Sequence, residues 1–236
     1  MNKQITVFGL CYNEEFMLPF FIAHYRKMFP GCRIVLWDNE STDRTHGIAI
    51  VNDCEIKTYC TGGKLNDVKY LELKNEWWRD ADTEWVCIVD IDEHLEIDHL
   101  QLSNEERSGY TLINFDGYNM VNLKDNLSFN EITYGVRAPS YDKYYLFNKS
   151  KINEINYNPG AHTASPIGDI RTTYNVYRCL HYKYLNPNYM VNRHAHFASR
   201  LSDVNLKHHY GGHYQYSEKR IRKEFEEARK NAIKIL

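Results

Sequence analysis

Short apolar segments alternate with amphipathic ones through the first hundred residues of the chain. The apolar segments are rich in β-branched and aromatic side chains, which is typical of buried strands. We expect four strands, at 5–10, 33–38, 55–59 and 84–90. Helices are expected between them, at 14–29, 41–50 and 65–80, and Pro19 predicts that the first of these kinks or begins late. Strands that alternate with helices predict an α/β fold with a mainly parallel sheet flanked by helices.

The second half of the chain is less regular. Strands are expected at 110–120 and 141–148, whereas 180–214 is dense in His, Tyr and Asn and shows few element signals. A final helix follows Ser217, and apolar residues recur along it at helical spacing: Ile221, Phe225, Ala228, Ala232 and Ile235. We interpret this stripe as a packing face opposite a solvated basic face. Peripheral membrane contact and pairing with a second copy through this helix stay open.

Composition and charge argue against several classes of protein. The chain has 236 residues and a net charge of -2, so it lacks the basic excess that nucleic-acid binding requires. The six cysteines form no CxxC pair, which favours reduced thiols over a disulfide framework. The N-terminal residues are too polar for a signal peptide, and no apolar run is long enough to span a membrane. We therefore expect a cytoplasmic protein.

Acidic side chains follow three of the expected strands. The segments are CYNEE at 11–15, DNESTD at 38–43 and DIDE at 90–93. Because ligands of parallel sheets bind beyond the carboxyl ends of the strands, we expect these segments to line one crevice. Asp90 and Asp92 lie on one side of an extended chain and supply half of a site for a hard cation. Taken alone, DIDE fits a metal site and a solvated acidic turn about equally.

The ordered series FGLCYNEE, VLWDNESTDRT and LKNEWWRDADTEWVCIVDIDEHL resembles a known family. It is similar to the nucleotide-binding half of glycosyltransferases with the GT-A fold, close to family 2, whose last motif is DXD. The resemblance covers 5–97, and Lys74 stands where the family usually has Arg. It implies a Rossmann-like GT-A domain with a nucleotide-sugar half at 1–98, an acceptor half at 99–216 that completes the metal site, and a C-terminal helix at 217–236.

The resemblance also implies an activity. A sugar would move from a nucleotide-diphosphate sugar, expected to be UDP-linked, to a glycan or other hydroxyl acceptor with inversion. A divalent metal, Mn²⁺ or Mg²⁺, would bind Asp92 and bridge the diphosphate, with Asp90 beside it as a second contact. The residues that the resemblance assigns to the nucleotide are Cys11, Asn13, Glu14, Asp38, Lys74 and Asp90. Within this set Asp38 would accept a hydrogen bond from the base, and Glu93 is expected to be a solvated acid.

The second half offers candidates that rest on weaker signals. His181 in CLHYKYL is the candidate third metal ligand, and Lys143 and His162 are candidate phosphate contacts. Asp169 is the candidate catalytic base, with Asp116 and His162 as competitors. Each of these residues also has an ordinary interpretation as a surface or turn residue.

Two other functions stay open. A sugar nucleotidyltransferase would use a similar sheet and acidic pair, but no Gly-rich loop with a basic residue follows the first strand. A non-catalytic glycan-binding module would account for the 19 tyrosines, but it leaves three acid-rich strand ends unexplained. If Asp92 pointed away from the other strand ends, the binding module would be favoured.

Overall fold

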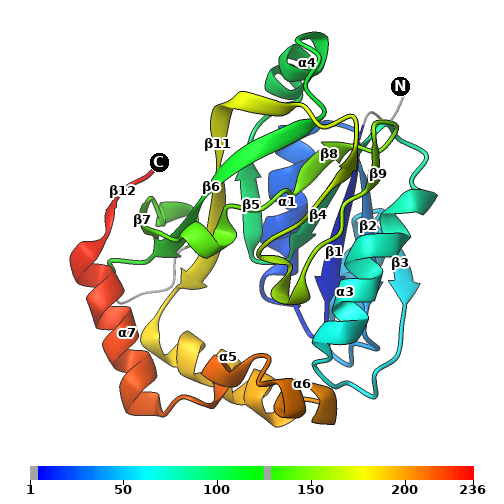
Figure 1. The fold of residues 1–236 in the computed structure, drawn as a ribbon. Coiled ribbons are helices and arrows are strands. Elements are labelled where there is room, and N and C mark those ends of the chain that lie inside the picture. The colour runs from blue at the N-terminus through cyan, green and yellow to red at the C-terminus, as the bar shows by residue number, and fades with distance from the viewer. Residues whose placement is uncertain (1–4, 125–128) are drawn as a thin grey trace.

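The computed structural model describes residues 5–124 and 129–236. Residues 1–4, part of the stretch judged too polar for a signal peptide, lie outside this range. Ten strands of the described chain form one mixed sheet (Figure 1). Four neighbouring strands in the order β3-β2-β1-β4 are mutually parallel: β1 Ile5–Cys11, β2 Arg33–Asp38, β3 Glu55–Thr58 and β4 Trp85–Asp90. The predicted α/β class is confirmed.

Antiparallel strands extend this sheet beyond β4. β8 pairs with β4 and with β6, while the long strand β11 runs parallel to β6 and antiparallel to β5. Strands β7 and β12 follow at the edge, and β9 and β10 form a separate pair. The bounds are β5 Glu93–Glu96, β6 Leu112–Val121, β7 Tyr134–Arg137, β8 Leu146–Asn148, β9 Ile152–Glu154, β10 Ile167–Gly168, β11 Thr172–Tyr184 and β12 Ile233–Lys234.

Helices cover both faces of the parallel strands. Because side chains alternate along a strand, β1 sends Ile5, Val7 and Cys11 into one apolar layer and Phe8 and Leu10 into the other. The first layer packs against α1, and the second against α3 (Figure 1). The helices are α1 Leu18–Met28, α2 Thr45–Val51, α3 Asp67–Glu76, α4 His99–Arg107, α5 Pro187–Arg200, α6 Asp203–His208 and α7 Glu218–Asn231; short 3-10 helices are η1 Trp77–Asp80, η2 Phe129–Glu131, η3 Pro139–Tyr141, η4 Pro159–Ala161 and η5 Gly212–Gln215.

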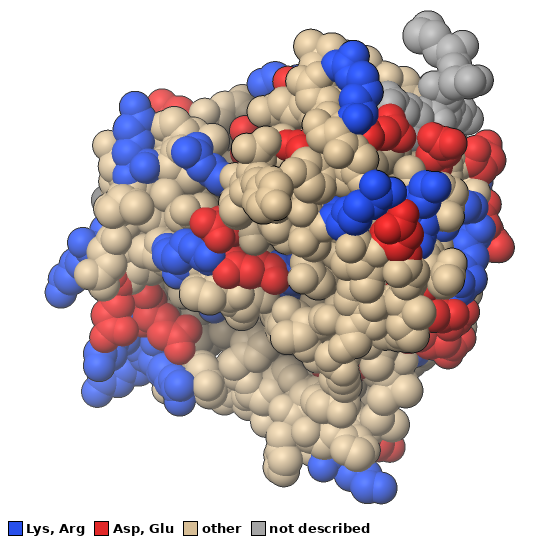
Figure 2. Space-filling view, turned by 45° about the horizontal axis from the view of Figure 1, so that its top comes forward, with Lys and Arg blue, Asp and Glu red and all other residues tan. Residues whose placement is uncertain are grey.

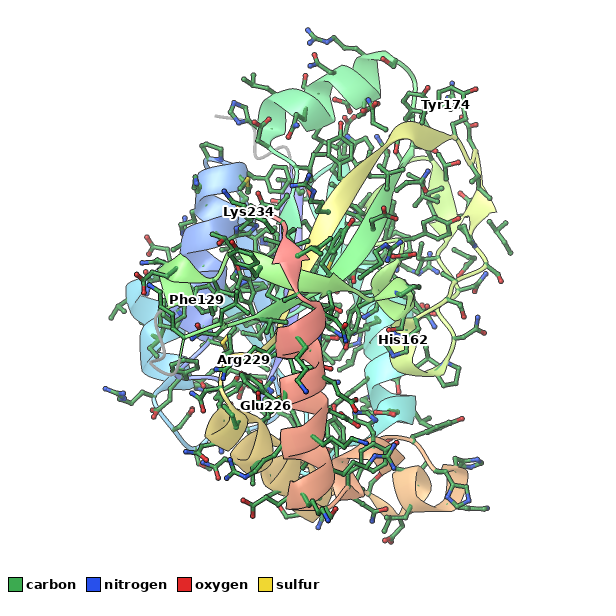
Figure 3. All side chains as sticks on the ribbon, turned by 90° about the vertical axis from the view of Figure 1, so that its left-hand side faces the viewer. Phe129, His162, Tyr174, Glu226, Arg229 and Lys234 are labelled. Atoms are coloured by element: carbon green, nitrogen blue, oxygen red, sulfur yellow. The ribbon has the colours of Figure 1, made fainter. Side chains whose placement is uncertain are left out.

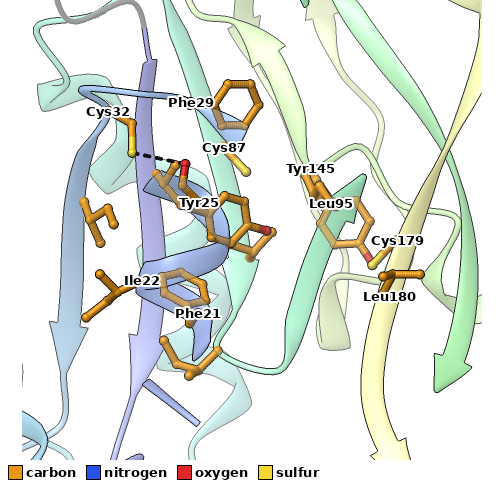
Figure 4. Close-up of a cluster of buried hydrophobic side chains, with 14 of the residues drawn as sticks. Phe21, Ile22, Tyr25, Phe29, Cys32, Cys87, Leu95, Tyr145, Cys179 and Leu180 are labelled. Carbon is orange, nitrogen blue, oxygen red and sulfur yellow. Dashed lines mark hydrogen bonds between the residues drawn. The ribbon is translucent and has the colours of Figure 1, made fainter. Parts of the chain in front are cut away.

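The layer under α1 is dense in aromatic and sulfur-containing side chains. Phe21 and Tyr25 of α1 are fully buried, and Cys87 and Cys179 are buried in the same cluster (Figure 4). The Cys32 thiol donates to the Tyr25 carbonyl oxygen at 3.6 Å. All six cysteines are free thiols, five of them buried. These thiols act as small apolar side chains in the core.

Most expected elements of the first half are present with shifted ends. The first helix begins at Leu18, so Pro19 falls in its first turn, where its missing N–H costs nothing. In the second half the expectations were poorer. The strand expected at 141–148 is reduced to Leu146–Asn148 after a 3-10 turn. Both β11 and α5 were missed.

The apolar stripe of the final helix packs within the chain. Ile221, Phe225 and Ala228 are buried against Tyr184 and Met190 of the described structure. The helix ends at Asn231, so the expected continuation of the stripe through Ala232 and Ile235 is wrong, because β12 follows at once and pairs with β7. The stripe is therefore not free to pair with a second copy.

Charged side chains are interspersed over the surface shown in Figure 2, with lysines and arginines beside acids. Many of them are ion-paired, for example Arg79 with Glu154 and Arg137 with Asp116. Among the described residues, no helix combines the length and apolar character that crossing a bilayer requires. The C-terminal helices α5 and α6 lie across the carboxyl ends of β1, β2 and β3 (Figure 1).

Candidate active site

A cavity of about 470 Å³ lies where the parallel strands end. Residues after β1 and β4 form one wall, and residues from β11, α5 and η5 close it from the other side. Eight of the side chains predicted from sequence line it: Cys11, Glu14, Lys74, Asp90, Asp92, Lys143, His162 and His181. Two of the three expected strand-end segments, 11–15 and 90–93, therefore meet in one crevice, whereas the third segment, 38–43, does not line the cavity.

The DIDE turn is held together by the one acid that sequence reasoning left aside. Glu93 was expected to be solvated, but only 1% of its side chain is exposed. Its carboxylate accepts from the Asp90 backbone N–H at 2.8 Å and from the Lys143 ammonium at 2.5 Å. Burial of an acid is tolerated here because a cation and a backbone donor satisfy it. Glu93 thus shapes the turn that presents Asp90 and Asp92.

Two lysines that were expected near the nucleotide are already paired with acids. The Lys74 ammonium lies 2.7 Å from Asp90, and Lys143 is bound to Glu93. Burial raises the pKa of Asp90, but Lys74 and Lys143 outweigh it and leave that pKa below its usual range. For Lys143, burial lowers the pKa, yet Glu93 and Asp90 raise it above its ordinary value. Lys143 therefore stays charged at the cavity wall.

Asp92 and His181 face each other across a gap. The Asp92 Oδ2 atom lies 3.6 Å from His181 Nε2, because β11 pairs antiparallel with β5 directly after the turn. His181 Nδ1 is 2.6 Å from Asn119 Oδ1, so Nδ1 donates to this amide oxygen and Nε2 is the nitrogen that faces Asp92. A proton or a cation can bridge this nitrogen and the carboxylate. The ring is held in place by Tyr141, which stacks on it at 4.0 Å.

This donor pair fits a divalent ion. Mn²⁺ and Mg²⁺ commonly take one or two protein ligands and complete their shell with water and phosphate oxygens, and an imidazole whose other nitrogen donates to a neighbour is the usual metal-binding form. Within the described residues no cluster of three or more His, Cys, Asp and Glu side chains is present. Asp92 and His181 would therefore supply two ligands to such an ion, and a bound diphosphate would supply others.

Arg193 of α5 was not predicted, yet it ties the two sides of the cavity together. Its guanidinium contacts both Glu14 oxygens, at 3.1 and 3.2 Å, and Asp92 Oδ2 at 3.1 Å. Burial raises the pKa of Glu14, and the two acids raise the pKa of Arg193 above its ordinary value although burial alone would lower it. Asn186 followed by Pro187 is a helix-start signal that would have located α5.

Two of the predicted nucleotide contacts are turned away from the cavity. Asp38 is 1% exposed and accepts from the Ser41 N–H at 2.9 Å and from His46 Nε2 at 2.7 Å. Asn13 accepts from the Thr42 N–H at 2.7 Å and so fastens the loop after β2. Neither residue lines the cavity. The Asp38 carboxylate is enclosed by its own loop, and its contact with the base stays a prediction.

Another part of the cavity wall is formed by aromatic side chains and one acid, none of which was predicted as a nucleotide contact. Tyr12 lies under the Arg200 guanidinium, 3.5 Å from its ring centroid, and Tyr59 and Tyr70 line the wall beside it. Asp67, in the first turn of α3, also faces the cavity, and burial raises its pKa. Aromatic rings with a nearby acid suit a base and a ribose. Sequence reasoning missed this group because its residues are scattered over three segments.

The candidate base Asp169 lies at the wrong end of the sheet. Its backbone is bonded to Lys151 and Thr111, beside the starts of β4 and β6, and its carboxylate pairs with Arg171. It is exposed and does not line the cavity. Its competitor Asp116 is paired with Arg137 and is also absent from the cavity wall. Asp169 lies there because β10, which precedes it directly, pairs antiparallel with β9.

His162 is the remaining candidate for proton transfer. It lies at the cavity mouth, toward the C-terminal helices and away from the Tyr174 end of β11 (Figure 3). Its Nδ1 atom donates to the Ser140 carbonyl oxygen at 2.7 Å, which leaves Nε2 as an acceptor. Burial and the nearby Lys143 lower its pKa from the ordinary value of 6.5, so the ring is neutral at pH 7.

No family model and no curated protein matches this chain. Among solved structures, it is similar to the crystal structure of S. aureus TarS, with 16% identity, a TM-score of 0.45 and coverage of 94% of this chain and 42% of that one. Residues 1–349 of TarS in complex with UDP-GlcNAc match at 15% identity and a TM-score of 0.47, over 94% and 71% of the two chains.

A third similar structure is glucosyl-3-phosphoglycerate synthase from Mycobacterium tuberculosis, in complex with Mn²⁺, UDP and glucosyl-3-phosphoglycerate. It matches at 15% identity and a TM-score of 0.35, over 49% of this chain and 44% of that one. The chain thus spans less than half the length of this structure and of the first TarS structure. GT-A glycosyltransferases are among the structures that it resembles, at low identity.

Proposed function

We propose that this protein transfers a sugar from a nucleoside diphosphate sugar, expected to be UDP-linked, to a hydroxyl acceptor, with a divalent cation bound at Asp92 and His181. The observation that carries the proposal is the 3.6 Å approach of these two ligands in the cavity at the strand ends. The sequence motifs that resemble family 2 glycosyltransferases support it. A bound Mn²⁺ or Mg²⁺ would neutralise charge that develops on the departing diphosphate.

Other side chains of the cavity would bind the nucleotide. Tyr12, Tyr70 and Asp67 line one part of the cavity. The two rings would flank a base and ribose, and Asp67 would accept from their N–H or O–H groups. Lys74 and Arg193 also line the cavity, and they would lie near a bound diphosphate. Basic side chains in contact with the diphosphate would stabilise the negative charge that develops on it.

Nucleotide binding with and without metal is the direct test. We expect UDP to bind at least about tenfold more tightly in Mn²⁺ than in EDTA, since the cation links Asp92 and His181 to the diphosphate. Isothermal titration of the intact chain with UDP, CDP and GDP measures this and ranks the bases. Tight binding of a nucleoside triphosphate with release of pyrophosphate would instead favour the nucleotidyltransferase. Binding of glycans without any nucleotide would favour the binding module.

His162 is proposed as the base that takes the acceptor's proton through Nε2. We expect His162→Gln to lower kcat by about 10²-fold, because the glutamine keeps a polar contact but cannot accept the proton. The lowered pKa of His162 keeps the wild-type ring neutral at pH 7, so the wild-type rate should fall only as pH drops below 6.5. That acid limb should flatten in the variant.

The measurement is a pH-rate profile of kcat with UDP affinity determined beside it. Since His162 lies at the mouth of the cavity, its replacement should leave the dissociation constant of UDP unchanged. A variant with full kcat and the wild-type acid limb would remove His162 from the mechanism. Equal losses in UDP affinity and kcat would indicate a phosphate contact instead.

A further inference from the structure

One carboxylate oxygen in the cavity, Asp92 Oδ2, lies close to two other side chains. Asp92 Oδ2 faces His181 Nε2 at 3.6 Å, and it also accepts from Arg193 Nη2 at 3.1 Å. A divalent cation between Asp92 and His181 would approach the same oxygen that the guanidinium contacts. A guanidinium and a divalent cation at one carboxylate oxygen repel each other in a buried site. The contact with Arg193 therefore opposes metal binding.

The geometry points to Arg193 as a positioning residue that makes metal binding depend on the nucleotide diphosphate. This inference rests on the proposed function. With the cavity empty of substrate, Arg193 keeps Asp92 and Glu14 in place and weakens the affinity for a metal ion alone. When a diphosphate arrives, its oxygens give the guanidinium a new partner and release Asp92 for the cation. Metal and diphosphate then tighten each other's binding, as linkage requires.

The way Arg193 is held permits this exchange. Glu14 is contacted through both guanidinium Nη atoms, whereas Asp92 is contacted through Nη2 alone. Leaving Asp92 would therefore cost one contact and keep the other ion pair. Phe197, whose ring centroid lies 4.8 Å from the guanidinium carbon, supports the planar group from one side. The arginine thus stays anchored to the first strand end through Glu14 while its free edge turns to the ligand.

The net charge of Asp92, Glu14 and Arg193 also favours binding of the metal together with the diphosphate. Asp92 and Glu14 together carry two negative charges, and Arg193 returns one, which leaves the group at about minus one. A divalent cation alone would make it positive and bring two cations together. A nucleoside diphosphate that enters with the cation removes that excess. Two nearby lysines are already paired with other acids: Lys74 with Asp90 and Lys143 with Glu93.

The test is Mn²⁺ binding followed by electron paramagnetic resonance, with and without UDP. For the wild type we expect UDP to tighten Mn²⁺ binding at least about tenfold. The double variant Glu14→Gln/Arg193→Gln removes one negative and one positive charge, so the net charge of the group is unchanged and no buried Glu14 charge is left unpaired. In this variant Mn²⁺ alone should bind about tenfold more tightly. The tightening of Mn²⁺ binding by UDP should be smaller than in the wild type, because only the part that comes from the cation's link to the diphosphate remains.

Arg137→Gln is the matched control, because Arg137 pairs with Asp116 and Asp142 outside the cavity. It should leave both affinities at wild-type values. If the double variant binds Mn²⁺ alone no better than the wild type, the competition between Arg193 and the metal is refuted. If the wild type binds UDP equally well in Mn²⁺ and EDTA, the proposed function fails instead.

A second measurement needs no variant. In a crystal structure of the wild type with Mn²⁺ and UDP, we expect Arg193 Nη2 to lie on a phosphate oxygen and no longer on Asp92, with the Glu14 contacts kept. A structure in which Arg193 still holds Asp92 Oδ2 beside a bound metal ion would overturn the inference.

Discussion

Asp92→Ala should abolish metal-assisted UDP binding and lower the rate of sugar transfer by about 10³-fold or more. Asp92 is the oxygen ligand of the proposed metal site, and no other carboxylate faces His181 Nε2 at the same distance among the described ion pairs. Without it the imidazole remains as a single ligand, and the link between the diphosphate and the protein through the metal is weakened. The measurements are Mn²⁺-dependent UDP affinity and initial rates of transfer.

The fold should survive this change. Arg193 keeps its two contacts with Glu14, so the substitution leaves no buried cation unpaired. Asp169→Ala is the control, since Asp169 is exposed, paired with Arg171 and distant from the cavity. Its activity should equal that of the wild type. A folded Asp92→Ala variant with full Mn²⁺-dependent activity would disprove the metal site, and an inactive Asp169→Ala variant would reopen the assignment of the base.

The largest loss of stability is expected for Glu93→Ala. Its partner Lys143 is only 4% exposed at the side chain, and removal of one member of a buried ion pair costs about 3–5 kcal/mol in the free energy of unfolding. The Asp90 N–H and the Tyr145 hydroxyl would lose an acceptor as well. Equilibrium urea unfolding, with nucleotide affinity measured beside it, reports both the fold and the turn that Glu93 holds.

Two further variants separate the causes. Glu55 pairs with Arg33 near the surface, where its side chain is 39% exposed, so Glu55→Ala should cost about 0–1 kcal/mol. The double variant Glu93→Met/Lys143→Met removes both buried charges and should recover most of the stability lost in Glu93→Ala. If Glu93→Ala were as stable as Glu55→Ala, the buried pair would have no structural role.

The first half of the fold could be predicted from the sequence because its strands and helices have strong local patterns of apolar residues. Segments 33–38 and 84–90 are apolar on both sides, as strands buried between two helical layers must be. The same parallel arrangement forces the ends of β1 and β4 to one edge, which is why Cys11, Glu14, Asp90 and Asp92 were correctly expected to meet.

The second half was poorly predicted because its signals are weak or shared with loops. Strand β11 has an irregular register, with side chains such as Tyr174 and Val176 exposed, so its apolar pattern is broken. Helix α5 is rich in His and Asn, which are ordinary helix formers at best. Its start signal at Asn186 and Pro187 was present, but the composition of the segment obscured it.

By itself, the sequence determined the class of fold, the four parallel strands and the edge where their acids collect, because these follow from local periodicity and from the direction of the strands. Only the tertiary structure decided which acid is free to act. Packing buried Glu93 against Lys143, enclosed Asp38 in its own loop and carried Asp169 to the opposite end of the sheet. It also brought Arg193, about a hundred residues from Asp92 in the chain, onto that carboxylate. Such contacts depend on long-range pairing, which no short stretch of sequence encodes.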